Sequence, residues 1–180
     1  MKKVILFLLG LSLALSAGAQ RWTIWYGVSI SDEIRNSSNS YNPKLHFSNC
    51  GVDYAFMVSN WDFTLGAGLN TKGHAYQINY AQLEGNAAYR FINTDSGFSL
   101  SALTGPYFGV KIADNSRNWV PGIKFQSCSV GWQAGIQMIF FKRLSLKVGY
   151  ERAFNTPMKG YAQSSDKIPH SLFIRIGDAF

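Results

Sequence analysis

The chain has 180 residues and a formal net charge of +7; 15% of its residues are aromatic and only 15% are charged. The length suits a single domain, and the charged fraction is well below the roughly 25% of ordinary soluble domains. The basic residues are scattered along the chain without forming a cluster, so we expect no nucleic-acid partner.

The N-terminal residues have the three parts of a secretory signal peptide. A basic start of two lysines is followed by an apolar run over 4–15 and by small residues up to Ala19. The apolar run is too short for a membrane-spanning helix, which needs about 20 residues. We therefore predict a signal peptide at 1–19, cleaved after its last residue, and a single β-barrel domain at 20–180.

The next stretches alternate between apolar and polar residues, the pattern of strands with one apolar face. We expect a first strand over 23–31, a second over 45–58 and a third starting at Trp61, with a short turn at 59–60. The opposite face has mostly Gly, Ser, Asn and Asp, together with Trp25. The predicted apolar face consists of Ile24, Tyr26, Val28, Ile30, Cys50, Val52, Tyr54, Phe56, Val58, Phe63, Leu65, Ala67 and Leu69.

The fourth strand is expected over 78–92, where the alternation has one irregularity. The later half places aromatic and aliphatic residues on the apolar face, but Ile78 and Tyr80 are out of phase with it. We therefore predict a bulge near Ala81. A polar turn over 93–97 follows.

The rest of the chain predicts four more strands. One over 98–112 contains Pro106, which cannot donate a hydrogen bond to a neighbouring strand. Residues 128–140 and 144–151 then form a hairpin in which every second residue is apolar, and the last strand covers 171–180.

The connections between these eight strands alternate in length. Short turns follow the second, fourth and sixth strands, whereas long polar loops occupy 32–43, 71–77, 113–122 and 155–169. This asymmetry, with a polar, glycine-rich face opposite an apolar one, is typical of bacterial outer-membrane barrels. Because lipid cannot satisfy an open sheet edge, the last strand must pair with the first. We predict an all-β fold, an eight-stranded antiparallel up-and-down transmembrane β-barrel.

The predicted interior contains both acidic and basic side chains. Eight strands enclose a space that side chains just fill, and burying a charge without a partner is costly. We therefore expect an internal network of ion pairs that fills the barrel. The predicted network consists of Asp53, Asp62, Glu84, Arg90, Lys111, Lys147, Glu151 and Arg175.

No pattern in the sequence predicts a catalytic, cofactor-binding or metal-binding site. An enzyme acting at the outer leaflet would need a cluster of Ser, His and Asp, but no spacing ties His46, His74 or His170 to a nucleophile. These histidines are interpreted as solvated loop residues. Cys50 and Cys128 fall on the apolar faces of strands expected to lie about opposite each other, so we predict no disulfide.

Four segments of the chain are similar to segments of a known protein family. These segments are YAQLEGNAAYRF at 80–91, TGPYFGVKI at 104–112, the hairpin sequence at 130–155 and the final HSLFIRIGDAF. These segments resemble the outer membrane β-barrel domain family that includes PorT-like proteins, although this chain has Gly85 and Asn86 where members often have Ile-Pro. The resemblance implies an integral outer-membrane protein, and PorT itself is implicated in the secretion and maturation of surface proteins.

Together these observations predict a non-enzymatic protein of the cell outer membrane whose extracellular loops form an interaction surface. Alternatives are a PorT-like secretion or assembly component, a narrow passive porin, or a soluble lipocalin-like barrel with its apolar face inward. The expected partners are outer-membrane lipid, lipopolysaccharide, an envelope or secretion protein, and the barrel-insertion machinery. The terminal Phe180 resembles the signal that this machinery reads.

Overall fold

The computed structural model describes the following residues: 19–33, 44–72, 77–114, 124–155, 158–159 and 169–180. Within them, eight long antiparallel strands form a closed barrel and two short strands form a separate sheet. The predicted fold class is therefore confirmed. The same residues contain no helix that is long and apolar enough to cross a bilayer. Most of the predicted signal peptide, and His74, lie outside the described residues.

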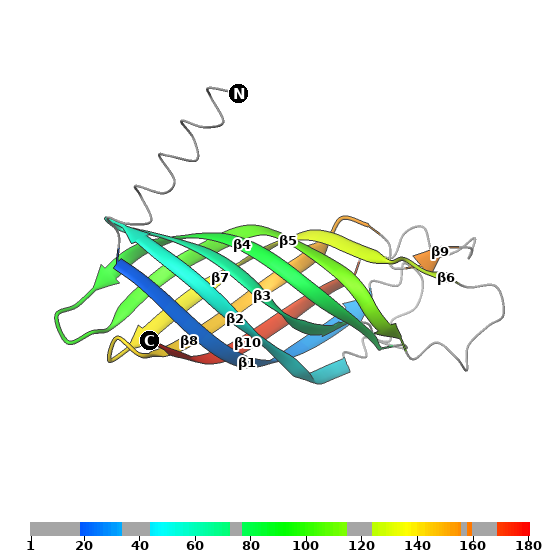
Figure 1. Ribbon diagram of the computed structural model, residues 1–180, viewed down its shortest axis with the longest axis horizontal. Helices are drawn as coiled ribbons and strands as arrows, with labels where there is room; N and C mark the ends of the chain where they lie inside the picture. Colours follow the sequence, from blue (N-terminus) through cyan, green and yellow to red (C-terminus); the bar gives the residue numbers. More distant parts are fainter. Residues whose placement is uncertain (1–18, 34–43, 73–76, 115–123, 156–157, 160–168) are drawn as a thin grey trace, which may run out of the picture.

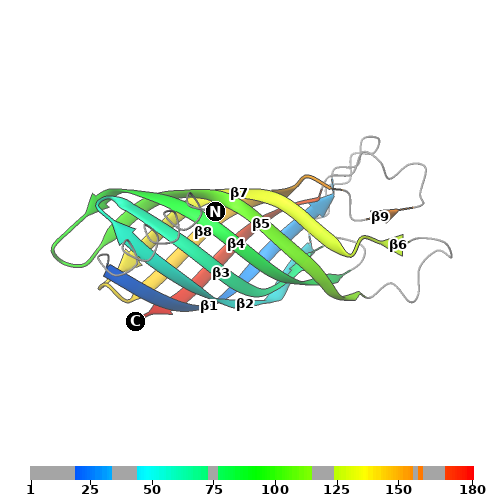
Figure 2. The same cartoon turned by 45° about the horizontal axis from the view of Figure 1, so that its top comes forward.

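The barrel strands have limits close to the predicted ones. They are β1 (Ala19–Glu33), β2 (Lys44–Val58), β3 (Trp61–Lys72), β4 (Ile78–Asn93), β5 (Ser99–Asp114), β7 (Cys128–Phe140), β8 (Leu144–Ala153) and β10 (Pro169–Ala179). The small sheet, which the sequence did not predict, pairs β6 (Lys124–Phe125) with β9 (Met158–Lys159). It lies beyond one end of the barrel in the side views of Figure 1 and Figure 2.

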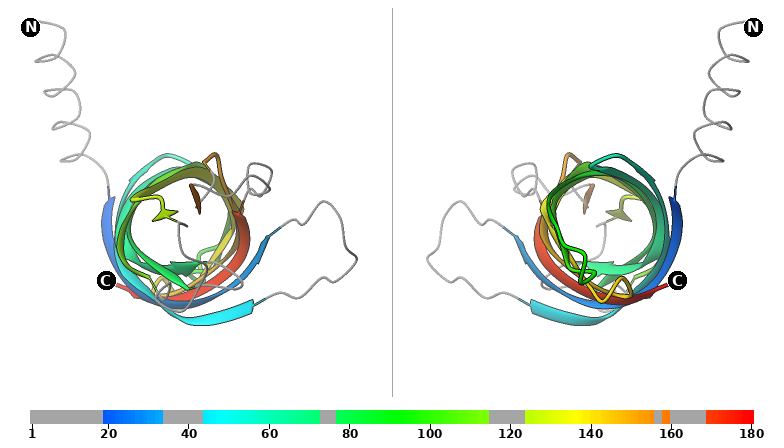
Figure 3. Two further views of the ribbon diagram at one scale, coloured as in Figure 1. Left: turned by 90° about the vertical axis from the view of Figure 1, so that its right-hand side faces the viewer. Right: turned by 90° about the vertical axis from the view of Figure 1, so that its left-hand side faces the viewer.

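The barrel closes by pairing its first strand with its last. β1 and β10 run antiparallel, with Thr23 opposite Ala179 and Ser31 opposite Ser171. At one end of this pair, the backbones of Trp22 and Phe180 exchange two hydrogen bonds of 2.9 Å. Each of the eight described barrel strands thus has a neighbour on both sides, as the ring of strands in Figure 3 shows. The barrel therefore presents no open edge.

The two ends of the barrel differ in their connections. Short turns join β2 to β3, β4 to β5 and β7 to β8 at the end where β1 begins and β10 ends, which we call the turn end. Ser59, Phe141 and Lys142 in these turns have φ values of 55°, 55° and 61°, the left-handed conformation that tight turns require. The other connections between barrel strands leave from the opposite end, which we call the loop end.

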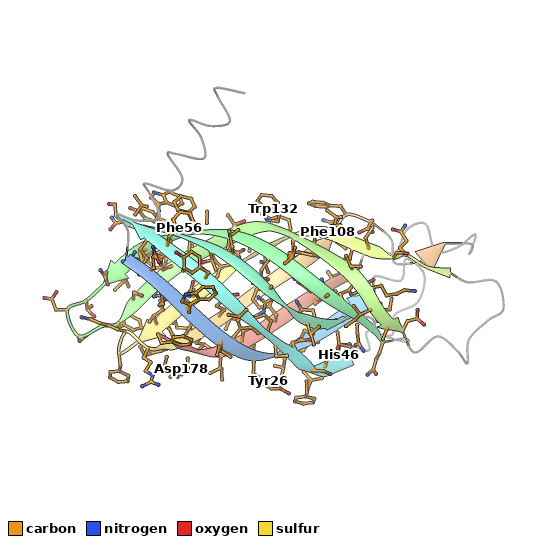
Figure 4. All side chains as sticks on the ribbon, in the orientation of Figure 1. Tyr26, His46, Phe56, Phe108, Trp132 and Asp178 are labelled. Carbon is orange, nitrogen blue, oxygen red and sulfur yellow. The ribbon has the colours of Figure 1, made fainter. Side chains whose placement is uncertain are left out.

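The outer face of the barrel is apolar and the inner face is mostly polar. Residues that point outward include Leu65, Leu83 and Ile24, which are 64%, 61% and 59% exposed. Figure 4 shows Tyr26 and Trp132 projecting outward from the wall. The next residue along each strand points inward and is usually buried, so burial alternates with a period of two. This distribution is the reverse of that in a soluble protein.

The start of β4 differs from the prediction. Ile78 and Tyr80 point inward, in phase with the rest of the strand, and are only 1% and 2% exposed. A register shift does lie close to the predicted bulge, but the extra residue is Ile112 in the neighbouring β5. The prediction assumed that an apolar residue must point outward, whereas the interior has room for the Tyr80 ring against Gly109.

Two further positions follow from the strand limits. His46 lies in β2 with its side chain buried in the interior, and His170 lies in β10, so both interpretations as loop residues were wrong. Cys50 and Cys128 are free cysteines on β2 and β7, which lie on opposite sides of the barrel, as predicted.

Candidate functional site

The interior contains an acidic wall built from three neighbouring strands. Asp53 of β2 lies opposite Gly66 of β3, which in turn lies opposite Glu84 of β4. A Cβ atom on Gly66 would lie 2.5 Å from Asp53 Oδ1 and 2.8 Å from Glu84 Cγ. The glycine therefore leaves space between the two strands for both acidic side chains.

A basic wall lies on the other side of the interior. Lys147 of β8 is directly opposite Arg175 of β10, and Arg175 is directly opposite Gly27 of β1. A Cβ atom on Gly27 would lie 2.9 Å from Arg175 Cγ, so this glycine also makes space for a long charged side chain. Like charges directly opposite each other on neighbouring strands are destabilising. The basic wall therefore needs anions from elsewhere in the barrel.

The acidic wall supplies these anions across the interior. Lys147 Nζ forms an ion pair with Asp53 Oδ2, and Arg175 Nη1 lies 2.6 Å from Glu84 Oε1. All four side chains are at most 6% exposed. β2 is not a neighbour of β8, nor β4 of β10, so both ion pairs span the interior. Gln133 donates a further hydrogen bond of 3.1 Å to Glu84 Oε2.

Trp25 connects the two cross-barrel ion pairs. Its indole Nε1 donates a hydrogen bond of 2.9 Å to Asp53 Oδ1, and the Arg175 guanidinium carbon lies 4.3 Å from the centroid of its ring. This cation–π contact adds to the ion pair. The ring fits because Gly51 and Gly68 lack side chains: a Cβ atom there would lie 2.5 and 2.8 Å from Trp25 Cζ2.

A third ion pair spans the interior closer to the loop end. Lys72 Nζ of β3 lies 3.0 Å from Glu151 Oε1 of β8, and both side chains are buried. The same ammonium group lies 3.8 Å from the centroid of the Tyr107 ring, and Ser171 donates a hydrogen bond of 3.2 Å to Glu151. Lys72 was not predicted as part of the network because a loop was expected at 71–77, whereas β3 extends to Lys72.

Two more ion pairs form within the barrel wall. Arg90 Nη2 of β4 lies 2.6 Å from Asp62 Oδ1 of the neighbouring β3. At the loop end of β5, Lys111 Nζ lies 2.7 Å from Asp114 Oδ2, where both side chains are about one-fifth exposed. Asp114 was also missed, because it too was assigned to a loop.

The structure therefore places every residue of the predicted network on the inner face. Six of these residues pair with one another, as Asp53–Lys147, Glu84–Arg175 and Asp62–Arg90. The other two, Glu151 and Lys111, pair with residues outside the predicted set. We call the ion pairs that span the barrel, together with Trp25, the interior network.

In the interior network, acidic and basic side chains fill the interior, and their charges balance. Each carboxylate in it faces a cation, and buried pairs of this kind persist because removing one partner leaves an uncompensated charge. The described residues contain no group of three or more His, Cys, Asp or Glu side chains arranged to hold a metal ion. The arrangement places paired side chains across the bore.

Comparison with protein-family models finds no match, and neither does a search of curated proteins. Among solved structures, the chain is similar to Neisserial surface protein A, with 12% sequence identity, 89% of this chain and 97% of that chain covered, and a TM-score of 0.51. At this identity the likeness shows a shared fold and nothing more.

Two other structures also match. The N-terminal β-barrel domain of Pseudomonas aeruginosa OprF has 13% identity, covers 88% of this chain and 97% of its own, and gives a TM-score of 0.47. The attachment invasion locus protein Ail of Yersinia pestis has 15% identity, covers 91% of this chain and 99% of its own, and gives a TM-score of 0.46.

Proposed function

We propose that the protein is an integral outer-membrane β-barrel that acts as a structural and interaction protein and not as an enzyme. The observation that supports this most directly is the distribution of side chains. Large apolar residues cover the outside of the described barrel, while Asp53, Glu84, Lys147 and Arg175 are buried inside it. In water such a continuous apolar surface would lead to aggregation, whereas in a bilayer it contacts lipid.

A cluster of aromatic rings at the turn end supports the same proposal. The Trp22 and Tyr54 ring centroids lie 4.8 Å apart, and those of Trp61 and Tyr89 lie 5.1 Å apart. These residues lie on four successive strands, close to where the short turns begin. Tryptophan and tyrosine are enriched where membrane meets water. The cluster therefore marks one edge of the proposed lipid-facing band.

In this proposal the loop end is the interaction surface. Four of the connections between barrel strands leave the barrel there, and the ion pairs of the interior network span the bore behind them. We propose that the signal peptide at 1–19 directs export, that the insertion machinery reads Phe180, and that the loops meet an envelope or secretion partner. Phe180 directly follows β10 at the turn end, points outward and is 67% exposed, which suits a site read by another protein.

The proposed membrane location can be tested by introducing an arginine at two outward positions that would lie at different depths in the bilayer. Leu65 lies in the middle of β3 and Ile112 near the loop end of β5, and both point outward. In a bilayer, Leu65→Arg costs about 2–4 kcal/mol and Ile112→Arg about 0–1 kcal/mol. The measurement is urea unfolding in lipid vesicles, followed by the gel shift between heated and unheated samples.

A soluble barrel would give a different result in the same experiment. A soluble barrel would place neither side chain in lipid, so both variants would keep or gain stability and would show no dependence on depth. Such a protein would also be recovered from cells without detergent. The wild-type chain is expected in the membrane fraction after a carbonate wash and in solution only after detergent is added.

A PorT-like role in secretion or assembly is a second candidate. It is supported by the segments at 80–91, 104–112 and 130–155, which resemble that family. The test is crosslinking followed by affinity purification from native outer membranes. A stoichiometric envelope or secretion partner would favour this role, whereas recovery of the barrel alone would exclude it.

A further inference from the structure

Arg152 is unlike the other cationic residues of the barrel wall. Among the barrel-strand arginines and lysines whose side chains the structure describes, it is the one that points outward, because its neighbours Glu151 and Ala153 point inward. Its side chain forms no ion pair or hydrogen bond with any residue whose side chain the structure describes. It is therefore a charge on an apolar face, without a partner among the described side chains.

The apolar face continues past Arg152 on several sides. Tyr150 and Phe154 precede and follow it on the outward face and are 41% and 65% exposed. Trp132 of β7 lies directly opposite it and is 46% exposed, and Leu172 of β10, opposite Tyr150, is 51% exposed. The guanidinium group is thus surrounded by side chains suited to lipid, and it does not lie beyond the apolar band.

The depth of Arg152 fits the boundary between lipid tails and headgroups. It is eight residues after Leu144, the first residue of β8 at the turn end. With a rise of about 3.3 Å per residue and a tilt of about 40°, Arg152 lies about 20 Å along the barrel axis from that end. The apolar band of such barrels is about 25 Å tall, so Arg152 lies near its upper edge.

An imidazole side chain lies on the strand next to Arg152. His170 of β10 is directly opposite it, and the His170 ring lies 5.8 Å from the Tyr150 ring, centroid to centroid. In the same row, the next position is Asp32 of β1, which is opposite His170 and therefore two strands, or about 10 Å, from Arg152. The chain thus provides hydrogen-bond donors at this point without a directly opposed carboxylate.

We propose that Arg152, with His170 and Tyr150 beside it, binds the phosphate headgroup of a lipid in the leaflet at the loop end. This inference rests on the proposed membrane location of the barrel. A planar guanidinium group matches phosphate with two parallel hydrogen bonds. The exposed Trp132, Phe154 and Leu172 side chains contact the acyl chains of the same lipid. Free inorganic phosphate lacks those chains and makes only the polar contacts.

The experiment is a lipid titration of the full chain purified from membranes in detergent and freed of bound lipid. Native mass spectrometry compares a bisphosphorylated lipid A with the same lipid after removal of its phosphates. The phosphorylated form is expected to bind about tenfold more tightly, as one charge-assisted contact implies. Arg152→Gln is expected to abolish that preference, and Arg152→Lys to keep part of it.

Arg143→Gln is the matched control, because Arg143 lies in the turn after β7, at the opposite end, and pairs with Asp178. It should keep the full preference for the phosphorylated lipid. Equal binding by wild type and Arg152→Gln, or equal loss in Arg143→Gln, would overturn the inference. Complete displacement of lipid A by inorganic phosphate at an equal phosphate concentration would also overturn it, since the site would then be one for free anions.

The same samples distinguish this inference from the proposed function. A barrel that folds in detergent, with the usual gel shift on heating, but shows no preference for phosphate would refute the lipid site alone. A chain that is recovered without detergent, and binds neither lipid, would refute the membrane assignment and the lipid site together.

Discussion

Glycine residues determine where charged side chains fit inside this barrel. Gly66 separates Asp53 from Glu84, and Gly27 lies beside Arg175. At each position a Cβ atom would come within 3 Å of an interior side chain. At these two positions a residue with no side chain thus lies beside long charged ones on the inner face.

Removing one partner of a cross-barrel pair should be strongly destabilising. Arg175→Met leaves Glu84 buried without its cation, and the loss of a buried partner costs about 3–5 kcal/mol. We expect this decrease in the free energy of unfolding by urea in lipid vesicles. The double variant Arg175→Met/Glu84→Gln should recover a large part of the loss, because no charge then remains unpaired.

The exposed pair Arg143–Asp178 is the control for that series, since it joins a turn to β10 in contact with water. Arg143→Gln should leave the urea midpoint almost unchanged, because water screens such pairs. If Arg175→Met were no more harmful than Arg143→Gln, or if the double variant were less stable than Arg175→Met, the cross-barrel pairs would not have the structural role assigned to them.

At the scale of the strand, periodicity allowed most of the fold to be predicted. The alternation of β7, β8 and β10 is regular, and the structure places outward the residues that it assigned to the apolar face, such as Trp132, Tyr150 and Leu172. The same rule failed at Ile78 and Tyr80, because the interior also accepts apolar and aromatic groups where glycines leave space. Side-chain polarity alone does not distinguish these two environments.

The sequence predicted which residues belong to the interior network better than it predicted which of them form ion pairs with each other. Alternation within a strand determines which residues point inward, so Asp53 and Arg175 could be named from the sequence. Which residue faces which across the barrel depends on how the closed ring staggers its strands, and this is not a local property of the sequence. Lys72 and Asp114 were missed for another reason: strand ends are the least regular part of the pattern.

The close contacts around Gly66 of β3 can be tested by adding a methyl group at that position. Gly66→Ala places a methyl group 2.5 Å from Asp53 Oδ1, whereas the Cβ atom of Gly85→Ala would meet nothing nearer than Leu65 Cδ2 at 3.8 Å. We expect Gly66→Ala to cost about 1–3 kcal/mol in urea unfolding, as overpacked interiors do. Gly85→Ala should have little effect. Equal stability of the two variants would show that the carboxylates move apart without cost.

Considered as a whole, the barrel is held together by its wall and by ion pairs through its middle. Backbone pairing closes the ring between β1 and β10. Asp53–Lys147, Glu84–Arg175 and Lys72–Glu151 each join strands that are not neighbours. The bore is consequently occupied by paired side chains.

This occupied bore leads to a prediction about ion passage. We expect the wild-type protein in a planar bilayer to give no steady conductance above that of the bare membrane. Glu84→Ala/Arg175→Ala removes one cross-barrel pair together with its volume and should produce measurable leak. A stable conductance from the wild type, unchanged in the double variant, would show that ions pass around the interior network and would favour the narrow porin.

The positions of the acidic and basic walls along the chain have a consequence for assembly. Asp53 and Glu84 come from early strands, whereas Lys147 and Arg175 are separated from them by 94 and 91 residues. A partial barrel that contains β2 and β4 but lacks β8 and β10 thus has two carboxylates without their partners. The buried carboxylates without cations destabilise an incomplete barrel. When β10 is added, it closes the ring of strands and supplies Arg175 as the cation for Glu84. The interior network thereby favours complete barrels over partial ones, so that insertion becomes an all-or-none event.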